Sequence, residues 1–152
     1  MIDLTLEVII LGIIFSIIAG IAMSIQGVFN TRASEKIGLW ETNLIVQGSA
    51  FVLTLVILMI AGNGNLKAIN EVNKLYLLGG VLSTVIIFTV MLGIKSLGPT
   101  YSIATILIAQ LTAAGIIDAF GLFDTKQMRF GLSKYIGIAF MILGIIIFKW
   151  KH

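Results

Sequence analysis

Long apolar runs without charge, separated by short polar segments, dominate the chain. No residue between 8 and 30, or between 42 and 62, carries a charge. Because the hydrocarbon core of a bilayer is about 30 Å thick, about 20 predominantly apolar helical residues are needed to cross it. The pattern predicts an all-α integral membrane protein in which residues 1–152 form a single transmembrane domain of five helices. The expected spans are about 6–30, 42–62, 75–95, 99–119 and 131–150.

The fifth span has the shortest apolar run, the 14 residues 135–148 between two lysines. A helix of that length reaches about 21 Å, which is less than the hydrocarbon core. Lys134 and Lys149 can extend their ammonium groups to the interface, and Tyr135 and Trp150 stand where interfacial aromatic residues are found. A crossing helix is therefore still the favoured interpretation.

Composition excludes a soluble fold and limits the classes of molecule that the chain is expected to contact. Hydrophobic residues make up 59% of the chain and charged residues 11%, with a mean hydropathy of +1.11, whereas soluble domains carry about 25% charged residues. The lipid bilayer is thus the expected partner. No basic run is interleaved with aromatic residues, so no nucleic acid is expected to bind. The acidic start, with Asp3 and Glu7, is unlike a cleavable signal, and we expect the first apolar segment to remain as a span.

Lys and Arg residues normally gather in cytoplasmic loops, but here five spans would divide the ten of them evenly. One face would carry Lys67, Lys74, Lys126, Arg129 and Lys134, and the other Arg32, Lys36, Lys95, Lys149 and Lys151. Without the fifth crossing, the division would become seven to three. Two interpretations stay open. Either copies insert in both orientations and pair as an antiparallel homodimer, or a subtler signal or a partner chain fixes one orientation.

Small residues recur along one face of the first span. Gly12, Ser16, Gly20 and Ser24 stand four residues apart, a spacing that lets two membrane helices approach closely. This face could contact a second copy or pack within the protomer. Gly137 and Gly144 give the fifth span a weaker surface of the same kind.

Amide side chains are the main polar groups within the spans, and in hydrocarbon each should face protein or water. Gln26 and Asn30 end the first span, and Asn43 and Gln47 begin the second. All four are expected at a similar depth, where they could line one polar vestibule for substrate or serve as interhelical hydrogen bonds. Gln110 lies near the midplane of the fourth span and is the strongest candidate for a substrate contact.

Carboxylates decide whether protons or ions could be coupled to transport. Asp118 is the most deeply placed, near the end of the fourth span, and is the candidate for ion or proton coupling. Glu7 and Glu41 lie at span edges, where carboxylates are usually solvated. The chain has no cysteine, and it contains no nucleotide-binding, metalloprotease or serine-hydrolase motif. We therefore expect no catalytic residue, metal site or cofactor.

The ordered set of polar and small residues resembles one known family. Gln26-Gly27-Val28-Phe29-Asn30, Gly79-Gly80, Gly98, Gln110, Asp118-Ala119-Phe120-Gly121, Gly137 and Gly144 are similar to the YdcZ family of the drug/metabolite transporter superfamily. The resemblance covers nearly the whole chain. It departs at Ala109 and Ser83, where a glycine would be expected, and this affects details of helix contact.

The resemblance implies a five-span exporter of the bacterial inner (plasma) membrane, half the size of the superfamily's ten-span members, which contain two inverted five-helix repeats. The small multidrug resistance proteins are similar in forming antiparallel dimers of short chains. They have four spans, however, and a glutamate in the middle of the first, where this chain has Gly20. Their proton mechanism therefore does not transfer directly.

These observations predict a secondary-active exporter of small organic molecules or cations that works by alternating access as an antiparallel homodimer. Two alternatives stay open. The chain could be a membrane scaffold or regulatory protein that transports nothing, or it could be half of a heterodimer with a paralogous chain.

Overall fold

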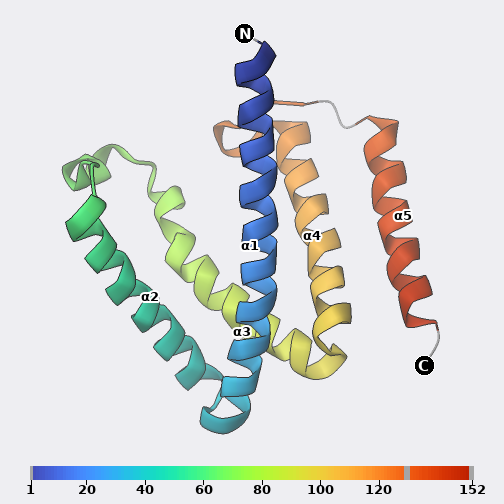
Figure 1. Ribbon diagram of the computed structural model, residues 1–152, viewed down its shortest axis with the longest axis horizontal. Coiled ribbons are helices and arrows are strands. Elements are labelled where there is room, and N and C mark those ends of the chain that lie inside the picture. Colours follow the sequence, from blue (N-terminus) through green and yellow to red (C-terminus); the bar gives the residue numbers. More distant parts are fainter. Residues whose placement is uncertain (1, 129–130, 151–152) are drawn as a thin grey trace. The chain divides into compact units, whose positions relative to one another are not determined.

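The computed structural model describes residues 2–128 and 131–150, which form helices and turns without a strand. This confirms the all-α prediction. The elements in chain order are α1 (Ile2–Ile37), α2 (Leu39–Ala61), η1 (Leu66–Glu71), η2 (Lys74–Leu78), α3 (Gly79–Leu97), α4 (Pro99–Phe120), η3 (Leu122–Asp124) and α5 (Leu132–Lys149), the η elements being 3₁₀ helices (Figure 1). They form two compact units, Met1–Ser96 and Leu97–His152. Arg129 and Lys151, which belong to the charge count, lie outside the described residues.

Among the described residues, four helical segments are long and apolar enough to cross a membrane: Glu7–Ile37, Leu39–Ala61, Lys74–Leu97 and Pro99–Phe120. The fifth, Leu132–Phe148, is a shorter apolar helix. Because α5 includes its flanking charged residues, its 18 residues reach about 27 Å, which is close to the thickness of the hydrocarbon core. Large apolar side chains such as Phe15, Phe51 and Ile60 are exposed on these helices, as on a surface that faces lipid.

The first helix is longer than the expected span, because α1 continues past residue 30 to Ile37. Arg32 pairs with Glu35 one turn later, at 3.2 Å between Nη1 and Oε2, and such pairs stabilise the exposed surface of a helix. The helix ends at Gly38, whose φ of 100° lies in the region that favours glycine. One residue therefore makes the whole turn between α1 and α2.

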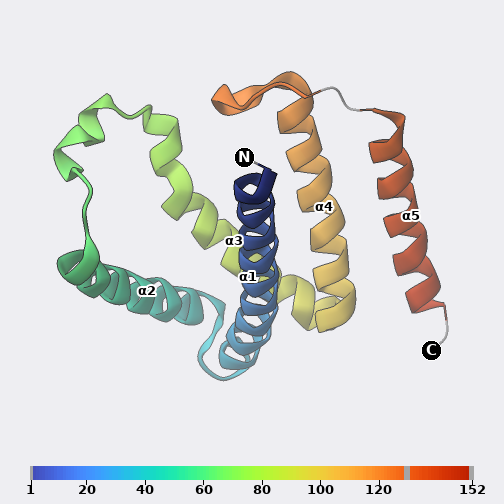
Figure 2. The same cartoon turned by 45° about the horizontal axis from the view of Figure 1, so that its top comes forward.

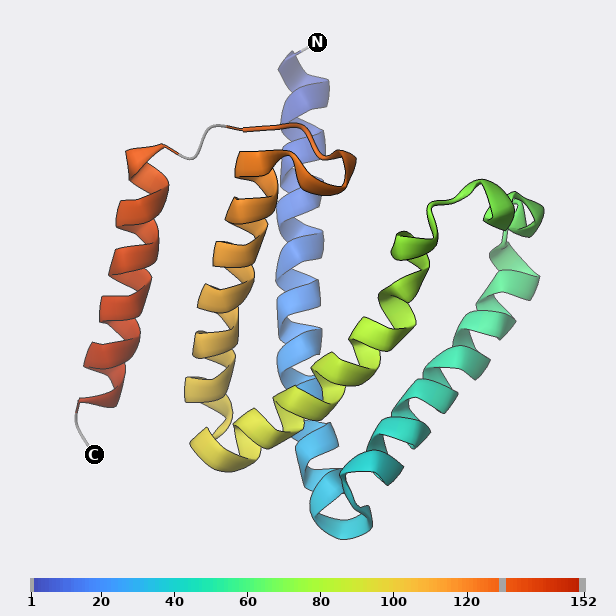
Figure 3. The ribbon, with the colours of Figure 1, turned by 180° about the vertical axis from the view of Figure 1, so that it is seen from behind.

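Helices α1, α2 and α3 meet near the Gly38 turn, where α3 crosses α1 (Figures 1 and 3). A Cβ added at Gly27 would lie 2.9 Å from Ile94 Cδ1 and 3.1 Å from Val90 Cγ1, so α1 and α3 approach closely at this glycine. The buried residues of this unit cluster at the same helix ends. They are Gly27, Asn30, Thr31 and Ser34 of α1, Thr42 and Asn43 of α2, and Ile87, Met91 and Ile94 of α3.

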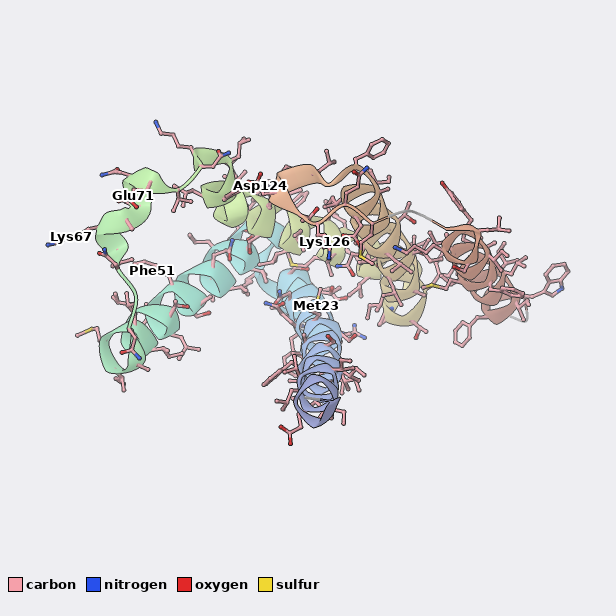
Figure 4. All side chains as sticks on the ribbon, turned by 90° about the horizontal axis from the view of Figure 1, so that it is seen from above. Met23, Phe51, Lys67, Glu71, Asp124 and Lys126 are labelled. Atoms are coloured by element: carbon pink, nitrogen blue, oxygen red, sulfur yellow. The ribbon has the colours of Figure 1, made fainter. Side chains whose placement is uncertain are left out.

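The connection between α2 and α3 folds into two 3₁₀ helices that the apolar pattern did not predict. Asn65 and Asn73 begin them, each accepting a hydrogen bond from a backbone N–H two residues later. Figure 4 shows Lys67 on this connection pointing away from the helices. The connection is thus ordered by local side-chain caps rather than by a core.

The second unit is an antiparallel pair of helices, α4 and α5, that lie side by side (Figures 1 and 2). Helix α4 begins with Pro99 in its first turn after Gly98, whose φ is 79°. Proline suits this position because its missing N–H would have no partner within the helix. This pair carries Gln110, Asp118, Gly137 and Gly144 of the sequence prediction.

Candidate functional site

Two of the predicted amides join α2 to α3. Asn43 Nδ2 donates to the Thr84 carbonyl at 2.8 Å, and Gln47 Nε2 donates to Thr84 Oγ1 at 3.2 Å. Ser83 Oγ donates to Gln47 Oε1 at 3.1 Å, and the Trp40 ring stacks on Phe88 with centroids 4.5 Å apart. These contacts make Asn43 and Gln47 part of the α2–α3 interface, because both Gln47 hydrogen bonds, to Thr84 and from Ser83, lie within it.

One acceptor in this network has no partner within the described residues. Asn43 is 2% exposed, and its Oδ1 makes no hydrogen bond. The amide cannot simply be reversed, because its other end faces the Thr84 carbonyl, which can only accept. A buried acceptor left unpaired costs about 1–3 kcal/mol. The network is therefore incomplete at Asn43.

The α1 amides do not join this network. Asn30 is buried, whereas Gln26 is exposed, and the α2 amides point to α3 instead. Within residues 2–128 and 131–150 no hydrogen bond joins the α1 pair to the α2 pair. A common vestibule of all four amides stays a prediction.

Asp118 lies in the wall of a cavity between α4 and α5. This cavity, of about 190 Å³, is lined by Leu111, Ala114, Gly115, Asp118, Lys134 and Ile138. Asp118 itself is half-buried. Gln110, the other predicted α4 residue, is exposed and does not line the cavity. The structure thus separates the two α4 residues that the sequence pointed to.

A folded loop holds the end of α4 that carries Asp118. Gly121 is left-handed at φ 61° and closes the helix by donating from its N–H to the Ile117 carbonyl. The Met128 N–H donates to the Asp118 carbonyl at 2.8 Å, and Gln127 Nε2 donates to the Ala119 carbonyl at 3.0 Å. Carbonyls that a helix end leaves unpaired are satisfied in this way. The backbone of Asp118 is fixed while its side chain faces the cavity.

A second cavity between α4 and α5, of about 250 Å³, is apolar. Its lining comprises Thr100, Tyr101, Ala104, Leu107, Met141, Gly144, Ile145 and Phe148. Gly144 therefore borders open space instead of a close helix contact. A Cβ added at Gly12, Gly20, Gly137 or Gly144 would meet nothing within 4 Å, so these predicted packing glycines make no close contact with the described residues of their own unit. Ser16 and Ser24 bond to the carbonyls of Gly12 and Gly20 on their own helix.

Three features of the sites were missed at the sequence level. Gly27 belongs to the segment that resembles the family, but its sequence context did not predict that α1 approaches α3 there. Thr84, the partner of both α2 amides, was not singled out, because an acceptor carbonyl leaves no mark in a sequence. Lys134 was assigned only to the interface, yet it lines the Asp118 cavity.

The family model described as "Putative inner membrane exporter, YdcZ" matches residues 11–147. No curated protein and no solved structure matches the chain. The matched range includes every residue discussed above as a candidate substrate or coupling residue.

Proposed function

This chain belongs to the YdcZ family of the inner membrane, and from that membership we propose that it is a secondary-active exporter of small organic molecules or cations. It would work by alternating access across five spans. The family description supports export, and four long apolar helices with a fifth shorter one support a multi-pass protein.

The observation that carries the proposal is Asp118, a half-buried carboxylate in a cavity between two apolar helices. Ionisable side chains within membrane helices are costly in free energy and generally belong to substrate or ion pathways. We assign Asp118 to the coupling of a proton or a cation. Gln26, Asn30, Asn43, Gln47 and Gln110 are the proposed substrate contacts, and the unpaired Asn43 Oδ1 supports one of them.

We propose that the working unit is an antiparallel homodimer, in which a second copy supplies the other inverted half. The open space at Gly12, Gly20 and Gly137 supports this assembly, since these residues are suited to close helix contacts and make none with the described residues of their own unit. An exchange of two equivalent halves would then provide alternating access.

Flux through proteoliposomes tests the transport function. Liposomes that contain the purified chain and are loaded with small cations, amino acids or metabolites should release them faster than loaded liposomes without protein. Asp118→Asn should remove the dependence of that flux on a proton or cation gradient. Flux from the chain alone also excludes the need for a paralogous partner. No substrate-dependent flux across the panel would favour the scaffold alternative.

Single-cysteine labelling tests the assembly. The chain has no cysteine, so Asn63→Cys places one thiol in the exposed connection after α2. In intact cells an impermeant maleimide should label about half of the molecules if both orientations exist. Labelling of all molecules or of none would contradict dual topology.

A further inference from the structure

The cavity that contains Asp118 also contains a positive charge, which nothing in the proposed function uses. Asp118 comes from the last turn of α4, and Lys134 comes from the first turn of α5. Because the two helices are antiparallel neighbours (Figures 1 and 2), both charged residues belong to the same end of the pair. The other four lining residues are apolar: Leu111, Ala114, Gly115 and Ile138.

The two charges share a cavity without forming an ion pair with each other. Within residues 2–128 and 131–150, the Asp118 carboxylate makes neither a hydrogen bond nor a salt bridge. Asp118 is half-buried, and a carboxylate partly removed from water without a partner is unfavourable, so the cavity favours a ligand that brings a positive group to Asp118. Lys134 has interactions within the chain, but its ammonium group carries three donors and can also contact a ligand.

Both charged residues stand on fixed backbone. The Asp118 carbonyl accepts the Met128 N–H at 2.8 Å, and the Lys134 N–H donates to the Gly131 carbonyl at 3.0 Å. Gly121 suits this geometry because its φ of 61° favours glycine, and an added Cβ would lie 3.3 Å from both Gln127 Cβ and the Thr125 carbonyl oxygen. A site held in this way requires little reorganisation when a ligand binds.

We propose that this cavity binds the head group of a small zwitterion, a molecule with one ammonium and one carboxylate group such as an α-amino acid. Asp118 takes the ammonium group, Lys134 takes the carboxylate, and the apolar wall of Leu111 and Ile138 takes a side chain. This assignment rests on the proposed function, for which it names the substrate class. The net charge of site and ligand together is zero, which suits a low-dielectric environment.

Binding to the full chain in lipid nanodiscs tests the site. The probes are glycine, L-leucine and two analogues of leucine that keep its apolar body, 3-methylbutylamine without the carboxylate and 4-methylpentanoate without the ammonium group. Loss of one partner from a desolvated charge pair costs about 2 kcal/mol or more, or about 30-fold in affinity. Each analogue should therefore bind at least that much more weakly than leucine. An analogue that equals leucine, or no binding of either glycine or leucine, would overturn the proposal.

Substitutions separate ligand contact from a structural role. Asp118→Asn and Lys134→Gln should each weaken leucine binding by about 30-fold. Asp118→Asn should also abolish the preference for leucine over 4-methylpentanoate, and Lys134→Gln the preference over 3-methylbutylamine. The loop variants Asp124→Asn and Lys126→Gln are matched controls, because neither residue lines the cavity. A residue that only supports the fold would weaken all probes alike, and that result would contradict the assignment.

The outcomes also distinguish this inference from the proposed function. Flux of another solute without zwitterion binding would overturn the inference alone. Zwitterion binding without flux would contradict the proposed transport function but would still support the zwitterion site. If Asp118→Asn does not fold, the exchange of both charges in Asp118→Lys with Lys134→Asp provides a second test, since it should keep the preference for leucine over both analogues. Loss of that preference in a folded double variant would count against the proposal.

Discussion

Two helix pairs of this protein treat their polar groups in opposite ways. Between α2 and α3, Asn43 and Gln47 bond directly to Thr84, and the helices touch through these groups. Between α4 and α5, Asp118 and Lys134 face a cavity of about 190 Å³. The first pair is held by its polar side chains, whereas the second leaves space beside them.

The difference separates two roles that look the same in a hydropathy plot. A polar residue within an apolar helix can join helices or can bind a ligand, and both are rare for the same energetic reason. The α2–α3 amides lie at a helix contact and are mostly satisfied there. The Asp118 carboxylate lies at a cavity and is satisfied by no other described residue. Available space, rather than polarity, points to the ligand site.

The largest expected effect comes from adding a charge between α2 and α3. Its counterpart is the removal of a charge between α4 and α5. Asn43→Asp would bury a carboxylate against the Thr84 carbonyl, at a residue that is 2% exposed. An uncompensated buried charge costs about 3–5 kcal/mol, so the free energy of unfolding, measured by SDS titration in mixed micelles, should fall by about 3 kcal/mol or more. Asp118→Asn removes an unpartnered charge at a half-buried residue and should leave the unfolding free energy unchanged within about 0.5 kcal/mol or raise it.

Asn63→Asp is the matched control for the first substitution, because Asn63 is exposed in the connection after α2. It should leave the unfolding free energy unchanged within about 0.5 kcal/mol. If Asn43→Asp and Asp118→Asn had equal effects, the two helix pairs would not differ as described.

A smaller effect is expected from filling space at two glycines. Gly27→Leu should force Ile94 and Val90 aside, since a Cβ alone would already lie 2.9 and 3.1 Å from their side chains. Overpacking of this kind costs about 1–3 kcal/mol. Gly144→Leu instead extends into the apolar cavity and should leave the unfolding free energy unchanged or higher. The same SDS titration measures both, and a loss at Gly144 as large as that at Gly27 would show that the apolar cavity is closed in the protein.

The helices were largely predictable because apolar runs of bilayer length leave few alternatives. Their bounds were less so. The first span was expected to stop near residue 30, yet Arg32 and Lys36 continue α1 to Ile37, because charge ends a membrane span without ending a helix. Gly38 ends α1 by its positive φ, and the backbone angle of a glycine cannot be predicted from the sequence alone.

The sequence was enough to identify the residues of the candidate sites, but not the residues that they contact. Asn43, Gln47 and Asp118 stood out because polar groups are scarce in the spans. Their surroundings depend on tertiary crossings, since Thr84 lies 41 residues from Asn43 and is recognised there through a backbone carbonyl. The pairing of Asp118 with Lys134 in one cavity likewise depends on how α4 and α5 pack, which periodicity does not specify.

The smallest expected effect concerns the hydrogen bond between Gln47 and Ser83, 3.1 Å long. Interhelical hydrogen bonds in membranes are worth about 0.6 kcal/mol on average, because the unfolded helices also find partners. A double-mutant cycle of Gln47→Leu and Ser83→Ala, measured by SDS titration, should give a coupling energy of about this size. A control cycle of Gln110→Leu and Thr112→Ala on α4 should give none, since residues two apart on a helix do not face each other. Equal coupling in the two cycles would mean that amide hydrogen bonds do not hold α2 to α3. The two helix pairs would then differ only in how closely their helices pack.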